Sequence, residues 1–274
     1  MLGYLYVSLT PRDESITRLL FASGEVGCMS PETRDVCIVG AGPAGLTAGI
    51  YTARAGLDTL VVDGGDPILE RNAHLENVPG FPAGVNARRF LDLTREQADR
   101  NGVVRREARV EAVSQTDGGR FEVALADADD RLLADRVICT SWADTNYLAG
   151  LAGVGLVDRG SKTYVDADED GHTDIEGLYA AGRIAERRHQ TVVAAGDGAN
   201  VALTVIEESD IPFYHDWVVP EGYFTGRDRE VPPGCEEIDD AERERREAEA
   251  REVMREHFAE PYPDEPTQHP SVEE

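Results

Sequence analysis

The sequence is poor in lysine and in long apolar stretches. Lys162 is the one lysine among 27 basic residues, against 53 acidic residues, so the formal net charge is −26. A field of this sign repels phosphates, and we expect neither nucleic acid nor a membrane surface as a partner. No stretch approaches the ~20 apolar residues of a membrane span. No basic residue precedes Arg12, so no secretory signal is expected, and the predicted localisation is cytoplasmic.

Cysteine is also scarce. The cysteines at positions 28, 37, 139 and 235 form no CxxC pair, which excludes the usual spacing of a redox-active dithiol. Cys37 and Cys139 lie in apolar, strand-like runs and are expected to be buried, reduced thiols. His74, His189 and His215 lack the spacing of metal ligands. The sequence therefore predicts no metal site and identifies no catalytic residue.

The composition still allows a folded protein. A hydrophobic content of 41% is sufficient for a core, although acidic chains of lower content are often disordered. We expect an acid-coated surface suited to a salt-rich cytoplasm. The electrostatic screening length falls to about 3 Å at 1 M salt, so repulsion among the acidic residues is weak there. The chain is therefore predicted to be halophilic and to lose its structure or its cofactor at low salt.

A glycine-rich turn between an apolar run and a helical pattern is the most informative motif. Gly40-Ala-Gly-Pro-Ala-Gly45 follows the run, and Asp63 closes a second run about 20 residues further on. Gly40 permits the tight turn, Gly42 leaves room for a pyrophosphate, and Gly45 lets the helix approach the strand. The helix N-terminus offers N–H groups to phosphates. Asp63 can accept hydrogen bonds from an adenosine ribose and would repel a 2′-phosphate. Together these features predict a dinucleotide site.

The remaining pattern predicts an α/β fold. The expected elements are a strand at 35–40, a helix at 43–55, a strand at 58–63, a helix near 87–101, strands near 103–106, 108–115, 120–125 and 131–139, a short strand ending at Gly182 and a helix at 191–206. Asp117-Gly-Gly119 predicts a hairpin turn within this series. The run from 108 to 139 thus reads as a β-meander inserted after a βαβ unit.

Several further segments match one family in order. They are Glu76-Asn-Val-Pro-Gly-Phe-Pro82 with Gly84-Val85, Val137-Ile-Cys-Thr140, residues 165–170, Thr173-Asp-Ile-Glu-Gly-Leu-Tyr-Ala-Ala-Gly182 and His189-Gln190. With the glycine motif they span residues 35–207. Over this range the chain resembles the FAD-binding domain of the thioredoxin reductase-like flavoproteins, within the two-dinucleotide-binding-domain family. The resemblance implies a Rossmann-like FAD-binding domain, with a parallel sheet, helices and the inserted meander, and FAD as the cofactor.

The resemblance also implies which residues bind FAD. They are Gly40, Gly42, Pro43, Ala44, Gly45, Asp63, Asn77, Val110, Thr140, Gly182, Arg183 and Gln190. Val110 would pass a backbone group beside the adenine, and Gly182 would lie against the pyrophosphate or the ribityl chain. Asn77 would lie near the ribityl chain or the isoalloxazine ring, and Gln190 beside its pyrimidine end. The alternatives are that Asn77 only bonds the backbone of its own turn and that Gln190 is only a helix-entry residue.

The chain also departs from the family pattern. Only residues 141–164 stand where the family carries its NAD(P)H domain, and they contain no second GxGxxG motif. The redox-active CxxC is absent as well. Arg183 replaces the acidic residue that follows Ala-Ala-Gly in the family, so that it either pairs with the pyrophosphate or marks a degraded site. Ser141-Trp142 replaces the usual Gly-Ala and would narrow the pocket.

These features predict an FAD-binding oxidoreductase, thioredoxin reductase-like but without dithiol chemistry. Its electrons would come from an external donor, either NAD(P)H or a redox protein. Two alternatives stay open: a non-catalytic FAD-binding, sensing or interaction protein, and a domain that has lost FAD and serves as a structural dimer module. A homodimer is a possible assembly for all of them.

The expected parts of the chain are a disordered extension at 1–32, the FAD-binding domain at 33–207, an aromatic C-terminal segment at 208–235, a charged helix at 236–258 and a disordered acidic tail at 259–274. Met29 rather than Met1 is the expected start of translation. The aromatic segment, which contains Trp217, would cover part of the flavin or form a dimer contact, or would simply pack on the core.

Overall fold

The computed structural model describes residues 31–65, 67–126 and 131–272. The predicted N-terminal extension and the start at Met29 lie almost entirely outside these residues. The helices and strands are β1 (Glu32–Val39), α1 (Pro43–Arg54), β2 (Thr59–Asp63), η1 (Ile68–Arg71), α2 (Ala87–Arg100), β3 (Val104–Glu107), β4 (Val110–Gln115), β5 (Phe121–Leu125), β6 (Leu132–Cys139), η2 (Asn146–Leu148), β7 (Leu156–Asp158), β8 (Thr163–Val165), β9 (Leu178–Ala180), η3 (Gly182–Ala185), α3 (Thr191–Glu207), β10 (Trp217–Pro220), η4 (Thr225–Arg227), β11 (Cys235–Ile238), α4 (Asp240–His257) and η5 (Pro270–Val272).

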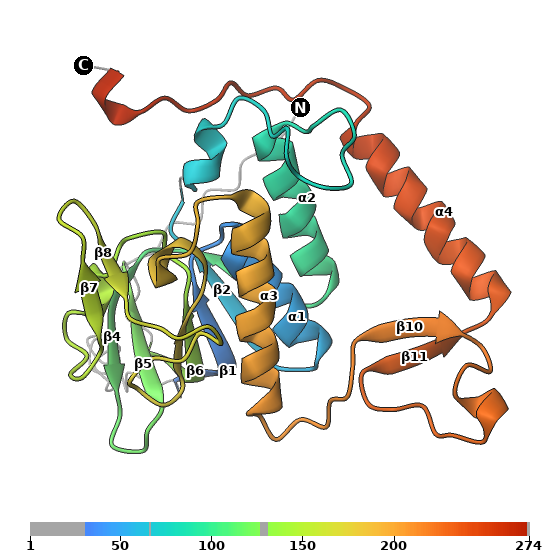
Figure 1. The fold of residues 1–274 in the computed structure, drawn as a ribbon, viewed down its shortest axis with the longest axis horizontal. Helices are drawn as coiled ribbons and strands as arrows, with labels where there is room; N and C mark the ends of the chain where they lie inside the picture. Colours follow the sequence, from blue (N-terminus) through green and yellow to red (C-terminus); the bar gives the residue numbers. More distant parts are fainter. Residues whose placement is uncertain (1–30, 66, 127–130, 273–274) are drawn as a thin grey trace, which may run out of the picture. The chain divides into compact units, whose positions relative to one another are not determined.

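The main sheet has the order β3-β2-β1-β6-β5-β4, with β9 beside β6 (Figure 1). β1 pairs in parallel with β2 and β6, and β3 and β9 extend the parallel part at either side. β4, β5 and β6 form an antiparallel meander. This arrangement confirms the predicted α/β fold with a parallel sheet and an inserted meander.

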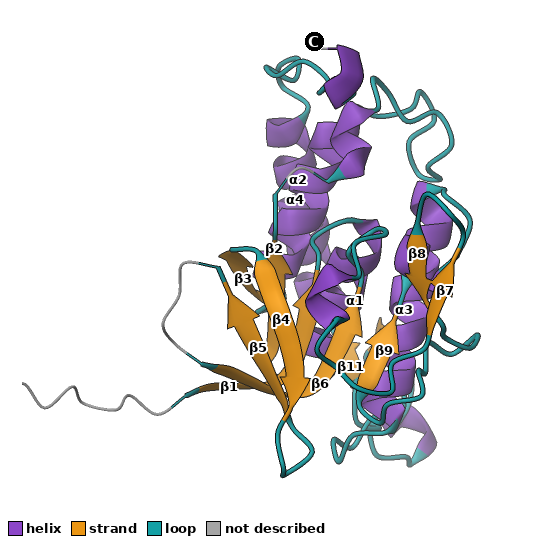
Figure 2. Ribbon diagram, turned by 90° about the vertical axis from the view of Figure 1, so that its left-hand side faces the viewer, coloured by secondary structure: helices purple, strands orange, loops and turns teal. Residues whose placement is uncertain are grey.

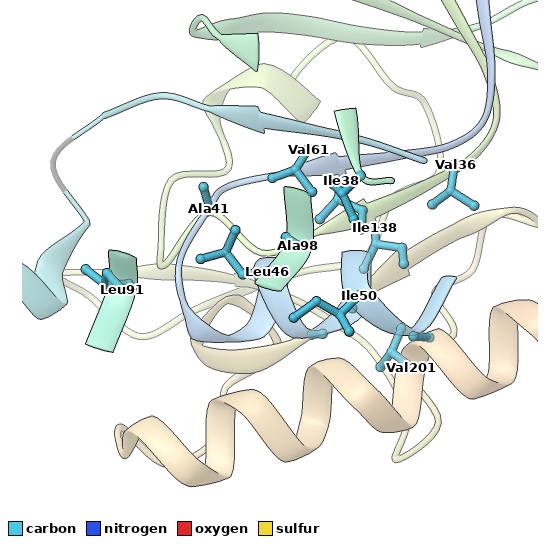
Figure 3. Packing of buried hydrophobic residues seen from close by; sticks show 14 of the residues in the cluster. Val36, Ile38, Ala41, Leu46, Ile50, Val61, Leu91, Ala98, Ile138 and Val201 are labelled. Atoms are coloured by element: carbon cyan, nitrogen blue, oxygen red, sulfur yellow. The ribbon is translucent and has the colours of Figure 1, made fainter. Parts of the chain in front are cut away.

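Both faces of the parallel strands are covered. Val36 and Ile38 of β1 face α1, α2 and α3, while Cys37 and Val39 face a second cluster that includes the meander. Figure 2 shows α1 and α3 on one side of the strands, and Figure 3 shows Ile38 beside Val61, its partner on β2. Strands that are buried on both faces have continuous apolar sequences, and for this reason they could be predicted from the sequence.

Helices α1 and α3 lie in close contact because glycine removes a side chain between them. A Cβ at Gly198 of α3 would lie 2.2 Å from the carbonyl oxygen of Ala44 in α1. The approach sets the N-terminal halves of these helices beside each other (Figure 1). The start of α3 is thereby placed next to the glycine-rich turn.

The segment at 141–164, where the resemblance places an NAD(P)H domain, is short. It contains η2 and the antiparallel hairpin of β7 and β8. In the ranges that the structure describes there is one parallel βαβ sheet and no second dinucleotide-binding fold. The hairpin was not predicted, since each of its strands has only three residues.

The C-terminal part forms a separate small pair of strands and a charged helix. β10 and β11 pair in parallel, and α4 begins after Asp239, whose side chain accepts a hydrogen bond from the Glu242 N–H at 2.8 Å. The tail differs from the expected disorder: within 259–272 it lies against α2, where Tyr262 donates a hydrogen bond to Asp92 at 2.6 Å. The composition of this tail predicted disorder because contacts of its aromatic residues with distant segments cannot be seen in composition.

None of the described helices is long and apolar enough to cross a membrane.

Candidate functional site

A cavity of about 990 Å³ opens at the carboxyl ends of β1 and β2. Its walls are the β1–α1 turn, the end of β2, the loop at 64–77, the start of β4, and parts of 140–147 and 183–194. Open α/β sheets bind ligands at this edge. The volume lies at the upper end of the ~300–1,000 Å³ range of cofactor clefts.

The glycine-rich turn has the geometry that its sequence predicted. Gly40 has a φ of 112°, and its N–H donates to the carbonyl oxygen of Val62 at 2.9 Å. A Cβ at Gly45 would lie 1.9 Å from the carbonyl oxygen of Gly40, so this residue must be glycine for helix and strand to approach. Thr140 completes the turn, since its hydroxyl donates to the Gly40 carbonyl at 2.9 Å.

Gly42 faces open space. A Cβ at this position would meet no atom within 4 Å, and the residue caps α1 without a side-chain hydrogen bond. Pro43 and Ala44 follow it along the cavity wall. The N–H groups of the first helical turn are therefore available to an anion, and the positive end of the helix dipole favours one there. This cradle fits a pyrophosphate.

Asp63 lies at the end of β2 and lines the cavity. Its side chain is 11% exposed, and it accepts a hydrogen bond from the Gly65 N–H at 3.0 Å. Arg95 lies 3.8 Å from the other carboxylate oxygen. The carboxylate is thus held beside the cleft, with lone pairs remaining for a ribose hydroxyl.

Asn77 and Gln190 meet across the cavity, although they are far apart in sequence. The Asn77 amide donates to the Gln190 side-chain oxygen at 2.8 Å, and both residues line the cavity. Gln190 precedes α3 without capping it through its side chain. Val110, 8% exposed, contributes the start of β4 to the same cavity.

Comparison with known proteins agrees with this geometry. Residues 35–75 match the family model of an FAD binding domain. The thioredoxin reductase of Mycolicibacterium smegmatis is 36% identical over 141 residues, which cover 51% of this chain and 44% of that protein. Mitochondrial thioredoxin reductase 1 of Arabidopsis thaliana is 31% identical over 198 residues, 68% of this chain and 49% of that protein.

A solved thioredoxin reductase structure from Gloeobacter violaceus superposes with a TM-score of 0.58 at 18% identity, and the match covers 68% of this chain and 100% of that chain. The chain has a thioredoxin reductase-like FAD-binding fold. FAD is the cofactor of this fold, and the chain spans less than half the length of the curated relatives it matches. The coverage corresponds to the FAD domain alone.

Two glycines of the predicted set support this FAD domain from outside the cavity wall. Gly45 packs the helix on the strand, as described above. Gly182 has a φ of 76°, and a Cβ there would lie 2.8 Å from the Cβ of Ala44. Its N–H donates to the carboxylate of Asp197 at 2.6 Å. Asp197, on α3, was missed by the sequence reasoning, although an acid among the small residues of this helix start was a usable signal.

Arg183 lines the cleft of the FAD domain and is held by its neighbours. Its guanidinium donates to the Tyr164 hydroxyl at 2.5 Å and to the Arg187 carbonyl oxygen at 2.9 Å, and it stacks 4.8 Å from the Tyr164 ring. Fixed in this way, it is a positive charge beside a cleft in a strongly acidic protein.

Trp142, which the sequence predicted to narrow the pocket, lines the cleft and contacts His189 edge to face, whereas the approach of Lys162 to its ring was not predicted. Trp142 has a φ of 61°, an uncommon conformation for a bulky residue, and its ring lies 4.2 Å from that of His189. The Lys162 ammonium lies 5.0 Å from the same indole. Burial, with help from Arg183 and Lys162, lowers the pKa of His189 below its ordinary value. The imidazole is therefore neutral at pH 7.

The cysteines of β1 and β6 are poor nucleophiles. Cys37 and Cys139 are fully buried, and burial raises the pKa of each thiol to about 12. Cys235 lies on β11, away from the cavity wall. Cys28 lies outside the described residues. Among the residues that the structure describes, no cluster of side chains could hold a metal ion.

The aromatic segment does not cover the flavin cleft, which corrects one expectation. Asp216 pairs with Arg54 at 2.5 Å, at the C-terminal end of α1, whereas the cleft lies at its N-terminal end. The helix of 12 residues separates the two by about 17 Å. The Trp217 ring instead contacts the Tyr223 ring edge to face, with 4.9 Å between their centres.

Proposed function

We propose that the protein is an FAD-dependent oxidoreductase of the thioredoxin reductase type, which performs no dithiol chemistry and receives electrons from an external donor. The donor is diffusing NAD(P)H or a reduced redox protein. The observation that carries the proposal is the open cradle at Gly42, with free N–H groups at the N-terminus of α1. Bound FAD supplies the redox chemistry, and the chain supplies binding and orientation.

Each part of the cleft has a role in this proposal. The cradle binds the pyrophosphate, and Asp63 accepts hydrogen bonds from the adenosine ribose. The Asn77–Gln190 pair orients the pyrimidine end of the flavin through amide groups that both donate and accept. Arg183 adds a positive charge that favours the pyrophosphate and any negative charge that develops on reduction.

Two features of the described residues support an external donor. The parallel sheet provides one dinucleotide cradle, and FAD takes it. The buried thiols Cys37 and Cys139 are too weakly acidic to exchange with a disulfide at neutral pH. Electrons must then arrive from outside the chain and leave for an acceptor outside it. We place this activity in a salt-rich cytoplasm, and a homodimer is compatible with it.

A second function is favoured by one observation. Trp142 and His189, in edge-to-face contact, both line the cleft, and we infer that they restrict the approach of a donor. A cleft that admits FAD and excludes donors would make the chain a non-catalytic FAD-binding or sensing protein. A structural module without FAD is disfavoured, because the cradle at Gly42 is open.

Anaerobic reduction separates these functions. The protein is purified in molar salt, loaded with FAD and titrated with NADH, NADPH and a reduced ferredoxin, with dithionite as the positive control. Bleaching of the flavin absorption by one of the biological donors is the result expected of an oxidoreductase. Bleaching by dithionite alone supports the sensing function. A protein that neither carries nor takes up FAD contradicts both.

A further inference from the structure

The segment after α4 crosses α2 and reaches the loop that forms one wall of the cleft. We refer to residues 258–267 as the C-terminal strap; Figure 1 shows it running from the end of α4 past the start of α2. The Arg89 guanidinium donates to the Glu260 carbonyl oxygen at 2.6 Å, and the Thr267 N–H donates to the Glu70 carbonyl oxygen at 3.3 Å. Hydrogen bonds to the backbone of the strap thus hold it near both ends.

Two buried arginines of α2 hold the aromatic residues of the strap. Arg88 and Arg89 are 5% and 8% exposed, and each guanidinium lies 5.7 Å from the centre of the Tyr262 ring. Arg89 also lies 5.1 Å from the Phe258 ring. A buried guanidinium is costly without partners, so these rings stabilise the positions of both arginines.

Arg88 connects the strap with the cavity wall. The same guanidinium nitrogen donates to the carbonyl oxygens of Glu70 and Asn72, at 2.8 and 3.0 Å. Asn72 and its neighbour Arg71 line the cavity. Leu69 anchors residues 68–72 in the core, and Arg88 fixes the backbone on either side of Arg71, so the position of this part of the cavity wall depends on where Arg88 is held.

A second connection leads from the strap to Asp63, the residue proposed to bind the adenosine ribose. The Tyr262 hydroxyl donates to one carboxylate oxygen of Asp92 at 2.6 Å, and Arg95 binds the other at 3.2 Å. Arg95 also lies 3.8 Å from Asp63 and 3.4 Å from Glu70. Burial and Asp92 raise the pKa of Tyr262 to about 12, so the hydroxyl remains a donor at neutral pH.

We propose that the C-terminal strap is part of the cofactor site, and that Tyr262 is a positioning residue for the adenosine half of FAD. Its ring holds Arg88 and thereby the loop at 68–72, and its hydroxyl holds the Asp92–Arg95 pair beside Asp63. This inference rests on the proposed binding of FAD. A strap that only stabilised the fold would lower the melting temperature without changing the affinity of the folded protein for the cofactor.

The test compares Tyr262→Ala with Tyr262→Phe in the full-length protein. Tyr262→Ala removes ring and hydroxyl, and Tyr262→Phe keeps the ring over the arginines. Tyr214→Ala is the control, because Tyr214 is 67% exposed on the aromatic segment and lies off the cavity wall. We measure the Kd of FAD and of ADP on apoprotein at a temperature where every variant is folded. Amide hydrogen exchange over residues 67–76 is measured as well.

We expect the Kd of both ligands to rise about tenfold in Tyr262→Ala and about threefold in Tyr262→Phe, with no change in the control. Amide hydrogen exchange over residues 67–76 should accelerate more in Tyr262→Ala than in Tyr262→Phe. Unchanged Kd values in Tyr262→Ala, or a loss for FAD without a loss for ADP, would overturn the inference and leave the proposed function standing. A wild-type protein that binds no FAD would instead overturn the proposed function. In that case, amide hydrogen exchange over residues 67–76 that is equal in all variants would also contradict the claim that the strap holds the loop in place.

Discussion

Replacing Gly42 with aspartate separates cofactor binding from folding. The position caps α1 with a φ of −82° and a ψ of −174°, and no atom would lie within 4 Å of a new Cβ. Aspartate is a preferred N-cap residue and its charge is favourable at a helix N-terminus. We therefore expect Gly42→Asp to stabilise the apoprotein by about 0.5–1 kcal/mol.

The same carboxylate should exclude the pyrophosphate. Two unit charges 4 Å apart at an effective dielectric constant of 20 repel by about 4 kcal/mol, which corresponds to a roughly thousandfold increase of the Kd. Gly42→Asn has the same shape and similar capping but no charge, so it isolates the electrostatic part. Gly45→Ala is the opposite case, because its Cβ would lie 1.9 Å from a backbone oxygen and should cost at least about 3 kcal/mol of stability.

Chemical denaturation of the three apoproteins and FAD titration by fluorescence, in one high-salt buffer, check these values. In Gly42→Asp the stability of the apoprotein should rise while its affinity for FAD falls. A Gly42→Asp variant that binds FAD as tightly as wild type would refute the position of the pyrophosphate. An apoprotein destabilised by the substitution would refute the open space in front of Gly42.

Three further predictions concern pH, thiols and salt. A hydrogen bond with Glu208 raises the pKa of His172 above 6.5, so charged His172 stabilises the fold below pH 6.5 and this effect fades as the pH rises through the raised value. His172→Gln should lower the free energy of unfolding by less than about 1 kcal/mol at acid pH and leave it unchanged in mild alkali. Urea denaturation at several pH values would test this. Cys37 and Cys139 should resist maleimide until the protein unfolds; labelling of the native protein would contradict their burial. The melting temperature should rise steeply with salt, since the net charge is −26, and melts that are flat with salt would exclude a halophilic surface.

Local chemistry made the central fold predictable. The apolar runs of β1 and β2 are continuous because both faces are buried, and the turn between β1 and α1 needs glycine at Gly40 and Gly45 for steric reasons. Such constraints are visible in a few neighbouring residues. The hairpin of β7 and β8 escaped prediction because strands of three residues leave no periodic pattern.

The parts of the site that the sequence did not reveal depend on contacts between distant segments. Trp142 was predicted to narrow the pocket, but the approach of Lys162 to its ring was not, because Lys162 lies about 20 residues later on a separate hairpin. Tyr262 lies against Asp92, 170 residues earlier. Composition predicted disorder for this tail because acidic and proline residues outnumber its few aromatics. Arginines on α2 provide the partners that composition does not show.

Quantification of the cofactor released from purified protein is the most direct test of the central claim. The protein is expressed and purified in molar salt, FAD is added in excess, unbound ligand is removed, and the bound fraction is released by denaturation and identified by mass. The cleft at the ends of β1 and β2 predicts one FAD for each chain, displaced by ADP. A protein that retains no FAD under these conditions, while its circular dichroism shows the folded α/β structure, would contradict the claim.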